Sequence, residues 1–235
     1  MADGQILVTG ASRGIGAAIV SELARRGYTV AGLSRSGEVP AGYGIACDVC
    51  DEQSVARAVA EVAANGTISG LINCAGAHAA VPTATLPVAD FEQTMRINTT
   101  AVLMVCQQAY PHLAENEQAL IVNIGSFFDK LGVVDNVAYC ASKAAVGAIT
   151  RCLSVEWAKD GIRVLNVAPG YIETDLNRDY LSKEKVRGWL SKRIPVARPG
   201  QVDEVARLVG ALFSENIGFL SGETIYIDGG QGINH

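Results

Sequence analysis

The sequence predicts an α/β fold in which a doubly wound parallel sheet is covered by helices on both faces. Short β-branched runs alternate with longer segments of helical spacing, which is typical of repeated βαβ units. Several of the short runs are apolar throughout, as expected for strands that are buried on both sides. The chain contains no repeat, low-complexity tract or linker. We therefore expect one domain, residues 1–235, with three αβα layers.

The expected elements follow in order along the chain. The apolar runs predict seven strands, at residues 5–9, 29–33, 44–47, 70–73, 119–124, 163–167 and 224–227. Helical spacing predicts helices at residues 14–26, 52–64, 89–112, 137–159 and 202–213. Residues 171–198 interrupt the alternation, because they carry many charges and two prolines without a clear strand. A long excursion inside a compact domain is often a lid or a binding loop, so we expect this segment to cover the site.

The charge distribution indicates which kinds of molecule the protein binds. The formal net charge is −5, and acidic and basic residues are scattered along the chain, which disfavours binding to nucleic acid or to an anionic membrane. The first residues do not resemble a signal peptide, and no apolar segment has the length that spans a bilayer. We expect a cytoplasmic protein that binds a small molecule.

The six cysteines and three histidines form no metal-ligand pattern. Cys47 and Cys50 have the CxxC spacing of some redox and metal sites, but no second pair and no His cluster accompany them. In a chain of this size such cysteines are more often reduced, buried thiols. We predict no metal site.

The first predicted strand runs into a glycine-rich turn, TGASRGIG at residues 9–16, which opens the first helix. Its spacing is GxxxGxG rather than GxGxxG, yet the physics is similar. Glycines permit positive φ and close backbone approach, and the helix N-terminus offers N–H groups to a pyrophosphate. A structural tight turn is the alternative, but the position between a first strand and an amphipathic helix favours dinucleotide binding. The candidate binding residues here are Gly10, Ser12, Arg13, Gly14, Ile15 and Gly16.

The end of the second predicted strand favours NADP(H) over NAD(H). An acidic residue at this place would bind the ribose 2′-hydroxyl of NAD, but the sequence has Ser34 and Arg35 instead. An arginine fork is suited to a 2′-phosphate, and Arg13 in the glycine turn supplies a second one. The alternative is that Arg35 is a solvated surface charge.

Tyr139 and Lys143 lie four residues apart in the small, apolar run AYCASK, residues 138–143. This spacing places both side chains on one face of the predicted helix. Such a pair is either ordinary surface or acid–base machinery. A free tyrosine has a pKa of about 10 and transfers protons poorly at neutral pH. An ammonium on the same face would favour the phenolate and lower that pKa.

A set of motifs in fixed order completes the pattern. They are the glycine turn, Asp48-Val49 after the third strand, Asn73-Cys74-Ala75-Gly76, Asn98, Ser126, the YxxxK of Tyr139 and Lys143, Pro169-Gly170, and Thr174. Together they resemble the short-chain dehydrogenase/reductase family over essentially the whole chain, with Cys74 in place of the second asparagine of its NNAG motif. Within that family the chain is most similar to members that reduce 3-oxoacyl groups on acyl carrier protein.

The resemblance implies a Rossmann fold and a catalytic set of Asn98, Ser126, Tyr139 and Lys143. Tyr139 would protonate a carbonyl oxygen while the nicotinamide cofactor delivers hydride to carbon, and would act as the base in reverse. Lys143 would lower the pKa of Tyr139 and bind the nicotinamide ribose. Ser126 would orient the substrate oxygen, and Asn98 would hold a water linked to Lys143.

The resemblance also assigns the remaining cofactor contacts. Asp48 would bond the adenine amino group, with Val49 packed beside it. The adenosine ribose would be flanked by Asn73, Ala75 and Gly76. Ile172 and Thr174 would hold the nicotinamide carboxamide, near Pro169 and Gly170.

Aromatic residues near these motifs favour a modestly apolar ketone or secondary alcohol as substrate. The candidate pocket residues are Phe127, Phe128, Tyr171, Tyr180 and Trp189. Apolar and aromatic side chains commonly line small-molecule pockets, although each ring is about as often core or interface. A carrier-protein substrate is disfavoured, because the segment AENEQ at residues 114–118 is acidic where such reductases carry basic residues.

The function predicted is NADP(H)-dependent interconversion of a ketone and a secondary alcohol. Two alternatives stay open, an NAD-dependent alcohol or dihydrodiol dehydrogenase and a catalytically silent nucleotide-binding subunit. The second would usually lack the tyrosine or the lysine, and both are present. The helices at 89–112 and 137–159 resemble the pair through which family members associate, so we expect a homotetramer.

Overall fold

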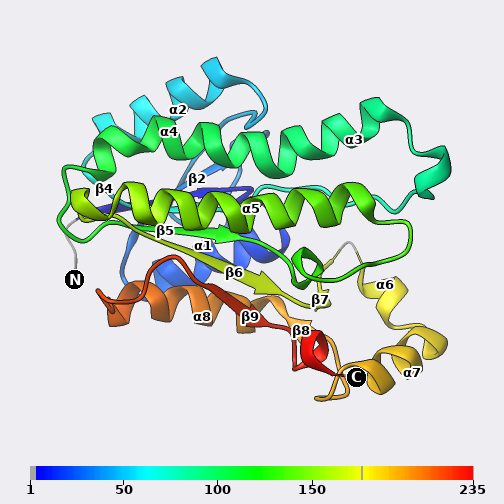
Figure 1. The fold of residues 1–235 in the computed structure, drawn as a ribbon. Helices are drawn as coiled ribbons and strands as arrows, with labels where there is room; N and C mark the ends of the chain where they lie inside the picture. The colour runs from blue at the N-terminus through cyan, green and yellow to red at the C-terminus, as the bar shows by residue number, and fades with distance from the viewer. Residues whose placement is uncertain (1–3, 176, 235) are drawn as a thin grey trace.

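The computed structural model describes residues 4–175 and 177–234, and a seven-stranded parallel sheet forms its centre (Figure 1). The strands are β1 (Gln5–Thr9), β2 (Thr29–Ser34), β3 (Tyr43–Ala46), β4 (Ile68–Asn73), β5 (Leu120–Ile124), β6 (Arg163–Pro169) and β9 (Thr224–Ile227). They lie in the order β3-β2-β1-β4-β5-β6-β9, and every neighbouring pair is parallel. All seven predicted strands are confirmed, with ends shifted by at most two residues.

Helices cover both faces of the sheet, so the three-layer prediction is also confirmed (Figure 1). One face carries α2 (Glu52–Ala64), α4 (Ala101–Leu113) and α5 (Val137–Glu156), and the other carries α1 (Gly14–Arg25) and α8 (Val202–Glu215). Successive side chains of a strand point to opposite faces. Accordingly Leu7 of β1 joins the core beneath α2, α4 and α5, while Ile6 and Val8 join the core beneath α1 and α8.

Two predicted helices differ from the expectation. The helix at 89–112 consists of α3 (Val88–Met95), a π-helical turn (Arg96–Thr100) and α4. A π turn accommodates an extra residue and is frequent at functional sites. The helix at 137–159 ends early, because α5 stops at Glu156 and a short 3₁₀ turn leads to Gly161, whose φ of 74° ends the helical path.

The excursion at 171–198 is a two-helix flap. Its base is a two-stranded pair of β7 (Ile172–Glu173) and β8 (Gly200–Gln201), and between them lie α6 (Arg178–Leu181) and α7 (Glu184–Arg193). Figure 1 shows both helices beyond the carboxyl end of β6. Leu181, Leu190 and Ile194 form a small buried cluster of their own. The flap therefore has an apolar interior independent of the main core.

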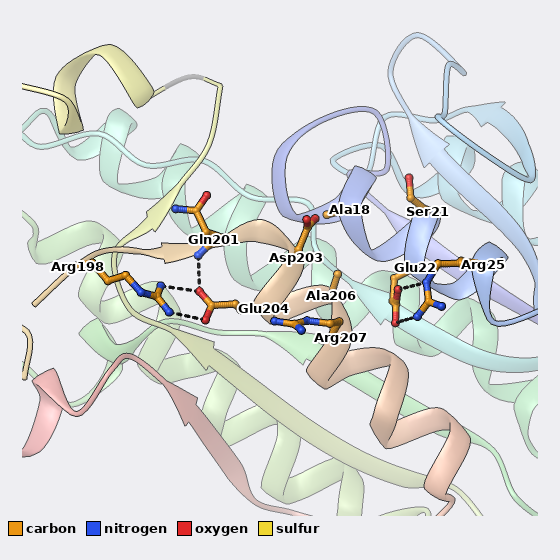
Figure 2. Close-up of a pocket in the computed structure, with 10 residues that line it drawn as sticks. All are labelled: Ala18, Ser21, Glu22, Arg25, Arg198, Gln201, Asp203, Glu204, Ala206 and Arg207. Carbon is orange, nitrogen blue, oxygen red and sulfur yellow. Dashed lines mark hydrogen bonds and ion pairs between the residues drawn. The ribbon is translucent and has the colours of Figure 1, made fainter. Parts of the chain in front are cut away.

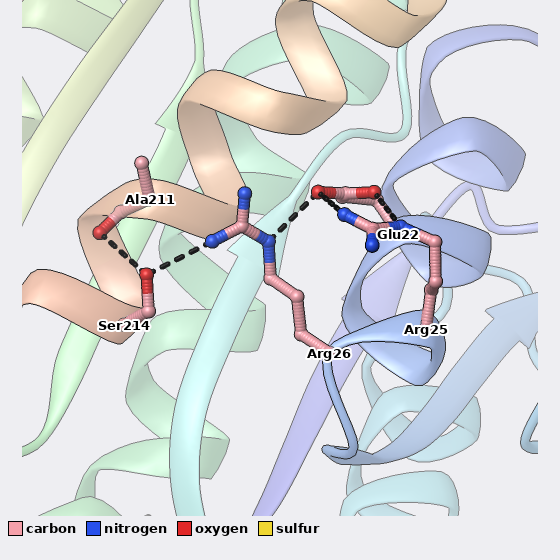
Figure 3. A network of polar contacts seen from close by, with 5 residues as sticks. All are labelled: Glu22, Arg25, Arg26, Ala211 and Ser214. Carbon is pink, nitrogen blue, oxygen red and sulfur yellow. Dashed lines mark hydrogen bonds and ion pairs between the residues drawn. The ribbon is translucent and has the colours of Figure 1, made fainter.

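Polar contacts complete the packing of α1 against α8 (Figure 3). Glu22 accepts hydrogen bonds from Arg25 at 2.8 Å and from Arg26 at 2.7 Å, and Arg26 donates to Ser214 of α8 at 2.9 Å. These arginines lower the pKa of Glu22 to about 2. Gly210 makes room for the bridge, since a Cβ there would lie 2.6 Å from Arg26 Nε.

Candidate active site

The strand order reverses between β1 and β4, and open α/β sheets bind ligands at the carboxyl edge beside such a reversal. The two loops that leave the sheet here are tied together at their bases. Thr9 Oγ1 accepts hydrogen bonds from the backbone N–H of Cys74 at 3.0 Å and of Ala75 at 3.2 Å. The glycine turn and the loop after β4 therefore form the two walls of one site.

Close backbone packing explains the glycines of the turn. Gly10 has φ +67°, and a Cβ there would lie 2.8 Å from Ala75 Cα, while a Cβ on Gly16 would collide with Gly10 O. Gly14 faces the opposite side of the site, because its Cβ position is 3.8 Å from Thr174 Cγ2. Gly14, which is predicted to hold the pyrophosphate, thus lies next to Thr174, which is predicted to hold the nicotinamide carboxamide.

The N-terminus of α1 is open to an anion. Arg13 occupies the N-cap without a capping hydrogen bond from its side chain, and the first turn contains no acidic residue. Ser12 and Arg13 are exposed, and Ile15 is half-buried. Because the first N–H groups of a helix lack intrahelical partners and carry the positive end of its dipole, this arrangement suits a phosphate.

The predicted adenosine end lies past β2 and β3. Ser34 is buried and donates to Glu38 O at 3.1 Å, whereas Arg35 is exposed. Asp48 Oδ1 accepts from the backbone N–H of Cys50 at 2.9 Å, and Val49 packs against the core. Burial raises the pKa of the Cys50 thiol, and Arg35 is among the charges that offset this. The backbone N–H of Cys47 donates to Ser34 O at 2.8 Å, so the end of β2 lies beside the loop that carries Asp48.

The side chain of Asn73 is directed into the sheet rather than toward the site. Its Nδ2 donates to Asn123 Oδ1 at 2.9 Å and to Cys106 Sγ at 3.3 Å, and the residue is 3% exposed. Asn123 in turn donates to Thr150 of α5 at 2.9 Å. Any contact between Asn73 and a cofactor would therefore use the backbone of Asn73. The sequence motif does not distinguish a backbone contact from a side-chain contact.

Ser126 and Tyr139 come together at the carboxyl end of β5. The Ser126 hydroxyl accepts from the backbone N–H of Phe128 at 3.3 Å. Burial raises the pKa of Tyr139, and the hydrogen bond with Ser126 partly offsets it. The direction differs from the expectation of a lowered pKa, because the enclosure of the phenol is the largest influence on it.

Lys143 is enclosed beneath Tyr139. Its Nζ donates to Ile124 O at 2.8 Å and lies 5.7 Å from the centroid of the Tyr139 ring. Burial lowers the pKa of this ammonium to about 8.

Asn98 lies on the π turn and is fully buried. It binds the loop after β4, because its Oδ1 accepts from Ala77 N at 2.8 Å and its Nδ2 donates to Ala77 O at 2.9 Å.

Asn98 and Lys143 meet beside Gly76. A Cβ on this residue would lie 3.2 Å from Asn98 Oδ1 and 3.8 Å from Lys143 Nζ. Asn98 Nδ2 also donates to Ser142 Oγ of α5 at 3.0 Å. The four predicted catalytic residues therefore occupy one site, although they come from the loop after β5, the π turn and α5.

The remaining predicted cofactor residues lie at the end of β6. Pro169 closes the strand, and Gly170 donates to Ile227 O at 3.0 Å, so that the chain turns close to β9. Ile172 is buried, and the backbone N–H of Thr174 donates to Asn177 Oδ1 at 2.7 Å. These contacts hold the strand end opposite the glycine turn.

The predicted pocket aromatics form a continuous row that begins at Tyr139. Ring centroids are 5.9 Å apart for Tyr139 and Phe128, 6.1 Å for Phe128 and Tyr171, and 5.8 Å for Tyr171 and Trp189. Phe127 lies 5.3 Å from Tyr171. Phe127 and Phe128 are buried and support the row, whereas Trp189 is 42% exposed. The side chain of Tyr180 lies outside the described part of the structure.

His78 is a neighbour of Tyr139 that no sequence motif identified. Its ring meets the Tyr139 ring edge-on at 4.8 Å, and its Nε2 is 2.6 Å from Asn136 Oδ1. Because Asn136 Nδ2 donates to Val134 O, its Oδ1 is the acceptor, and His78 Nε2 carries the hydrogen. The loop after β4 brings His78 to the site, and the path of this loop cannot be predicted from the sequence.

A surface groove of about 760 Å³ lies elsewhere, along α1 and α8 (Figure 2). Its charges are largely paired with each other: Arg198 with Glu204 and Arg25 with Glu22. None of the four predicted catalytic residues lines this groove.

Among residues 4–175 and 177–234, no three His, Cys, Asp or Glu side chains gather as metal ligands, and no helix could cross a membrane.

Comparison with known proteins agrees with this geometry. A family model described as enoyl-(acyl carrier protein) reductase matches residues 10–231. The chain is 35% identical to 3-oxoacyl-[acyl-carrier-protein] reductase MabA of Mycobacterium bovis, over 98% of this chain and 93% of the relative. It is also 35% identical to glucose 1-dehydrogenase of Gluconobacter oxydans, over 96% and 91%. A gluconate 5-dehydrogenase from Burkholderia cenocepacia, solved with NADP and tartrate, superimposes with a TM-score of 0.93 at 31% identity, over 100% of this chain and 97% of that one.

Proposed function

The chain belongs to the short-chain dehydrogenase/reductase family of oxidoreductases, which act on CH–OH and C=O groups, and from this premise we propose an NADP(H)-dependent carbonyl reductase. One observation carries the proposal: Ser126, Tyr139, Lys143 and Asn98 lie together at the edge where the glycine turn opens α1, with Asn98 and Lys143 beside Gly76. This arrangement supplies a proton donor and an oxygen-orienting hydroxyl next to a dinucleotide-type turn.

The residues present fit a dinucleotide cofactor. The uncapped N-terminus of α1 would hold the pyrophosphate. Arg13 and Arg35 are exposed and enter no ion pair within the described residues, so both are available to a 2′-phosphate. Ile172 and Thr174 would hold the carboxamide. When bound, the nicotinamide supplies or accepts the hydride at the substrate carbon.

The protein's own part in the reaction is to hold the carbonyl oxygen and to move one proton. The Ser126 hydroxyl would orient that oxygen, and Tyr139 Oη would donate to it during reduction. Burial raises the pKa of Tyr139 and so favours the protonated phenol that a general acid requires. Lys143 would stabilise the phenolate left behind.

The two alternatives make different demands on the site. An NAD-dependent dehydrogenase acting in the oxidative direction would use Tyr139 as the base and would bind NAD more tightly than NADP. A silent nucleotide-binding subunit would bind cofactor without turnover. The named substrates of the relatives, from 3-oxoacyl groups to sugars and sugar acids, leave the substrate class open.

The first experiment follows NADPH and NADH consumption against 3-oxoacyl thioesters, cyclic ketones, aryl ketones and keto acids. We expect turnover with NADPH, and a Tyr139→Phe variant that loses about 100-fold or more in kcat while still binding cofactor. Tyr110→Phe is a matched control, because its hydroxyl bonds Asp160 away from the site. If the protein binds cofactor tightly but reduces none of these ketones and oxidises none of the matching alcohols, the silent subunit is favoured.

A further inference from the structure

The flap concentrates positive charge on an otherwise acidic chain. Residues 178–198 contain seven Lys or Arg and two Asp or Glu, a formal net charge of +5 in a chain of −5. Arg178 is neutralised by Glu173 and Asp175, and Arg198 by Glu204. The excess therefore lies mainly on the helix between them.

Helix α7 carries four exposed basic residues, Lys185, Arg187, Lys192 and Arg193. None of them forms an ion pair with any residue that the structure describes. Buried Leu190 anchors the helix to the rest of the flap. These cations are thus held on a fixed helix and are available to a ligand.

Three of the four cations share one face with Trp189. Lys185 and Arg193 lie four residues before and after Trp189, and Lys192 lies three after it, which places them along one stripe. Arg187, two residues before Trp189, points to a different side of the helix. We call Lys185, Trp189, Lys192 and Arg193 the cationic face.

The cationic face is joined to the site through the aromatic row. The Arg193 guanidinium lies 4.7 Å from the centroid of the Trp189 ring, and Trp189 meets Tyr171 at 5.8 Å. From Tyr171 the row continues through Phe128 to Tyr139. A substrate whose carbonyl lies at Tyr139 and whose chain follows this row would end beside Arg193.

We propose that the cationic face binds an anionic group, a carboxylate or phosphate, at the end of the substrate remote from its carbonyl. This rests on the proposed function and names the substrate class, an acidic ketone or hydroxy acid with an apolar or aromatic spacer. Arginine donates two parallel hydrogen bonds to such a group, and the lysines add charge. The cationic face consists of four residues of one helix, whereas a docked protein contacts about 20–30 residues on each side.

The test compares methyl ketones that carry a terminal carboxylate, over a series of spacer lengths, with their methyl esters. We expect the wild type to prefer the acid at one spacer length, mainly through KM, and the preference to weaken as salt is added. The double variant Lys192→Gln/Arg193→Gln should lower the acid-to-ester ratio of kcat/KM about tenfold or more. Arg187→Gln removes the same kind of charge from the same helix and should keep the wild-type ratio.

A second readout does not depend on turnover. In a Trp157→Phe background, Trp189 is the one remaining tryptophan, so its fluorescence can be titrated with each acid and ester. Acid-specific quenching that is lost in the double variant supports the proposal even if no ketone is reduced, in which case the proposed function alone fails. Equal response to acid and ester, an equal loss in Arg187→Gln, or a preference seen only when the substrate is attached to an acidic carrier protein would overturn it.

Discussion

At Lys143 an ammonium lies inside the core with Ile124 O as its hydrogen-bond partner. Burial lowers its pKa from 10.5 to about 8, so the folded chain loses this proton at a lower pH than the unfolded chain. Below about pH 8 both states are protonated and the folded state bears the full cost of burial. As pH rises from 8 toward 10.5 the unfolded state binds more protons than the folded state, and this cost declines.

We therefore expect Lys143→Met to stabilise the unliganded protein. One pKa unit corresponds to about 1.4 kcal/mol, and the loss of the bond to Ile124 O offsets part of the gain. A net gain of about 2 kcal/mol would raise Tm by roughly 4–8 °C at pH 7, with a smaller gain at pH 10. Lys159→Met, at an exposed lysine, should change Tm little. Thermal unfolding of both variants at the two pH values decides this, and a lower Tm for Lys143→Met at pH 7 would contradict it.

The placement of Tyr139 and Lys143 on one helical face was predictable from sequence, but the electrostatics around them were not. Helical periodicity places Lys143 one turn after Tyr139, and both positions are where the pattern requires. The pattern does not contain the enclosure of Tyr139 by His78 and Phe128, or the carbonyl of Ile124 that binds the ammonium. Those neighbours arrive from β4 and β5, so the sign of the Tyr139 pKa shift depends on tertiary packing.

Among the elements, the π turn shows what periodicity cannot predict. The sequence predicts one continuous helix over residues 89–112, because the segments on both sides of the π turn are helical and nothing in their composition marks the extra residue. The turn rotates Asn98 into the interior, where it bonds the backbone of Ala77 and the hydroxyl of Ser142. Through these bonds the π turn between α3 and α4 holds the loop after β4 in place at the site.

Asn98→Ala should accordingly affect both stability and catalysis. Removing the amide leaves Ala77 N–H and C=O without their partner, which we expect to cost about 2 kcal/mol in urea unfolding. The loop would also lose its fixed position beside Lys143, so kcat should fall about tenfold or more. Thr94→Ala, which removes an exposed hydrogen bond to Asp90 O on α3, should stay within about 0.5 kcal/mol of the wild type. An Asn98→Ala variant with wild-type kcat would limit Asn98 to a structural role.

For the molecule as a whole, alternation of apolar runs and helical segments was sufficient to predict seven parallel strands and three layers. The strand order and the meeting of β1 with β4 depend on the handedness of the crossovers, which is a general property of such folds. The flap was predicted only as an interruption, because its short helices bury a cluster around Leu190 that is too small to give a clear period.

The outer surface of α5 makes the predicted homotetramer testable. Ala144, Ala148, Cys152 and Val155 are exposed along one stripe of this helix, and Val155 is 82% exposed. Small apolar residues at this spacing allow two helices to pack closely, and an exposed apolar stripe usually marks an interface. We expect light scattering to give about four times the chain mass of 24.6 kDa.

Ala148→Glu would place a charge at the centre of this stripe, and a buried unpaired charge is costly. The variant should therefore have a lower mass, that of a dimer or monomer, at the same protein concentration. Val88→Glu is the matched control, since Val88 is 72% exposed on α3 outside the stripe, and its mass should equal that of the wild type. If Ala148→Glu keeps the wild-type mass while Val88→Glu lowers it, assembly uses α3 rather than α5. If the wild type itself is monomeric, the stripe is ordinary surface and the site described above is complete within one chain.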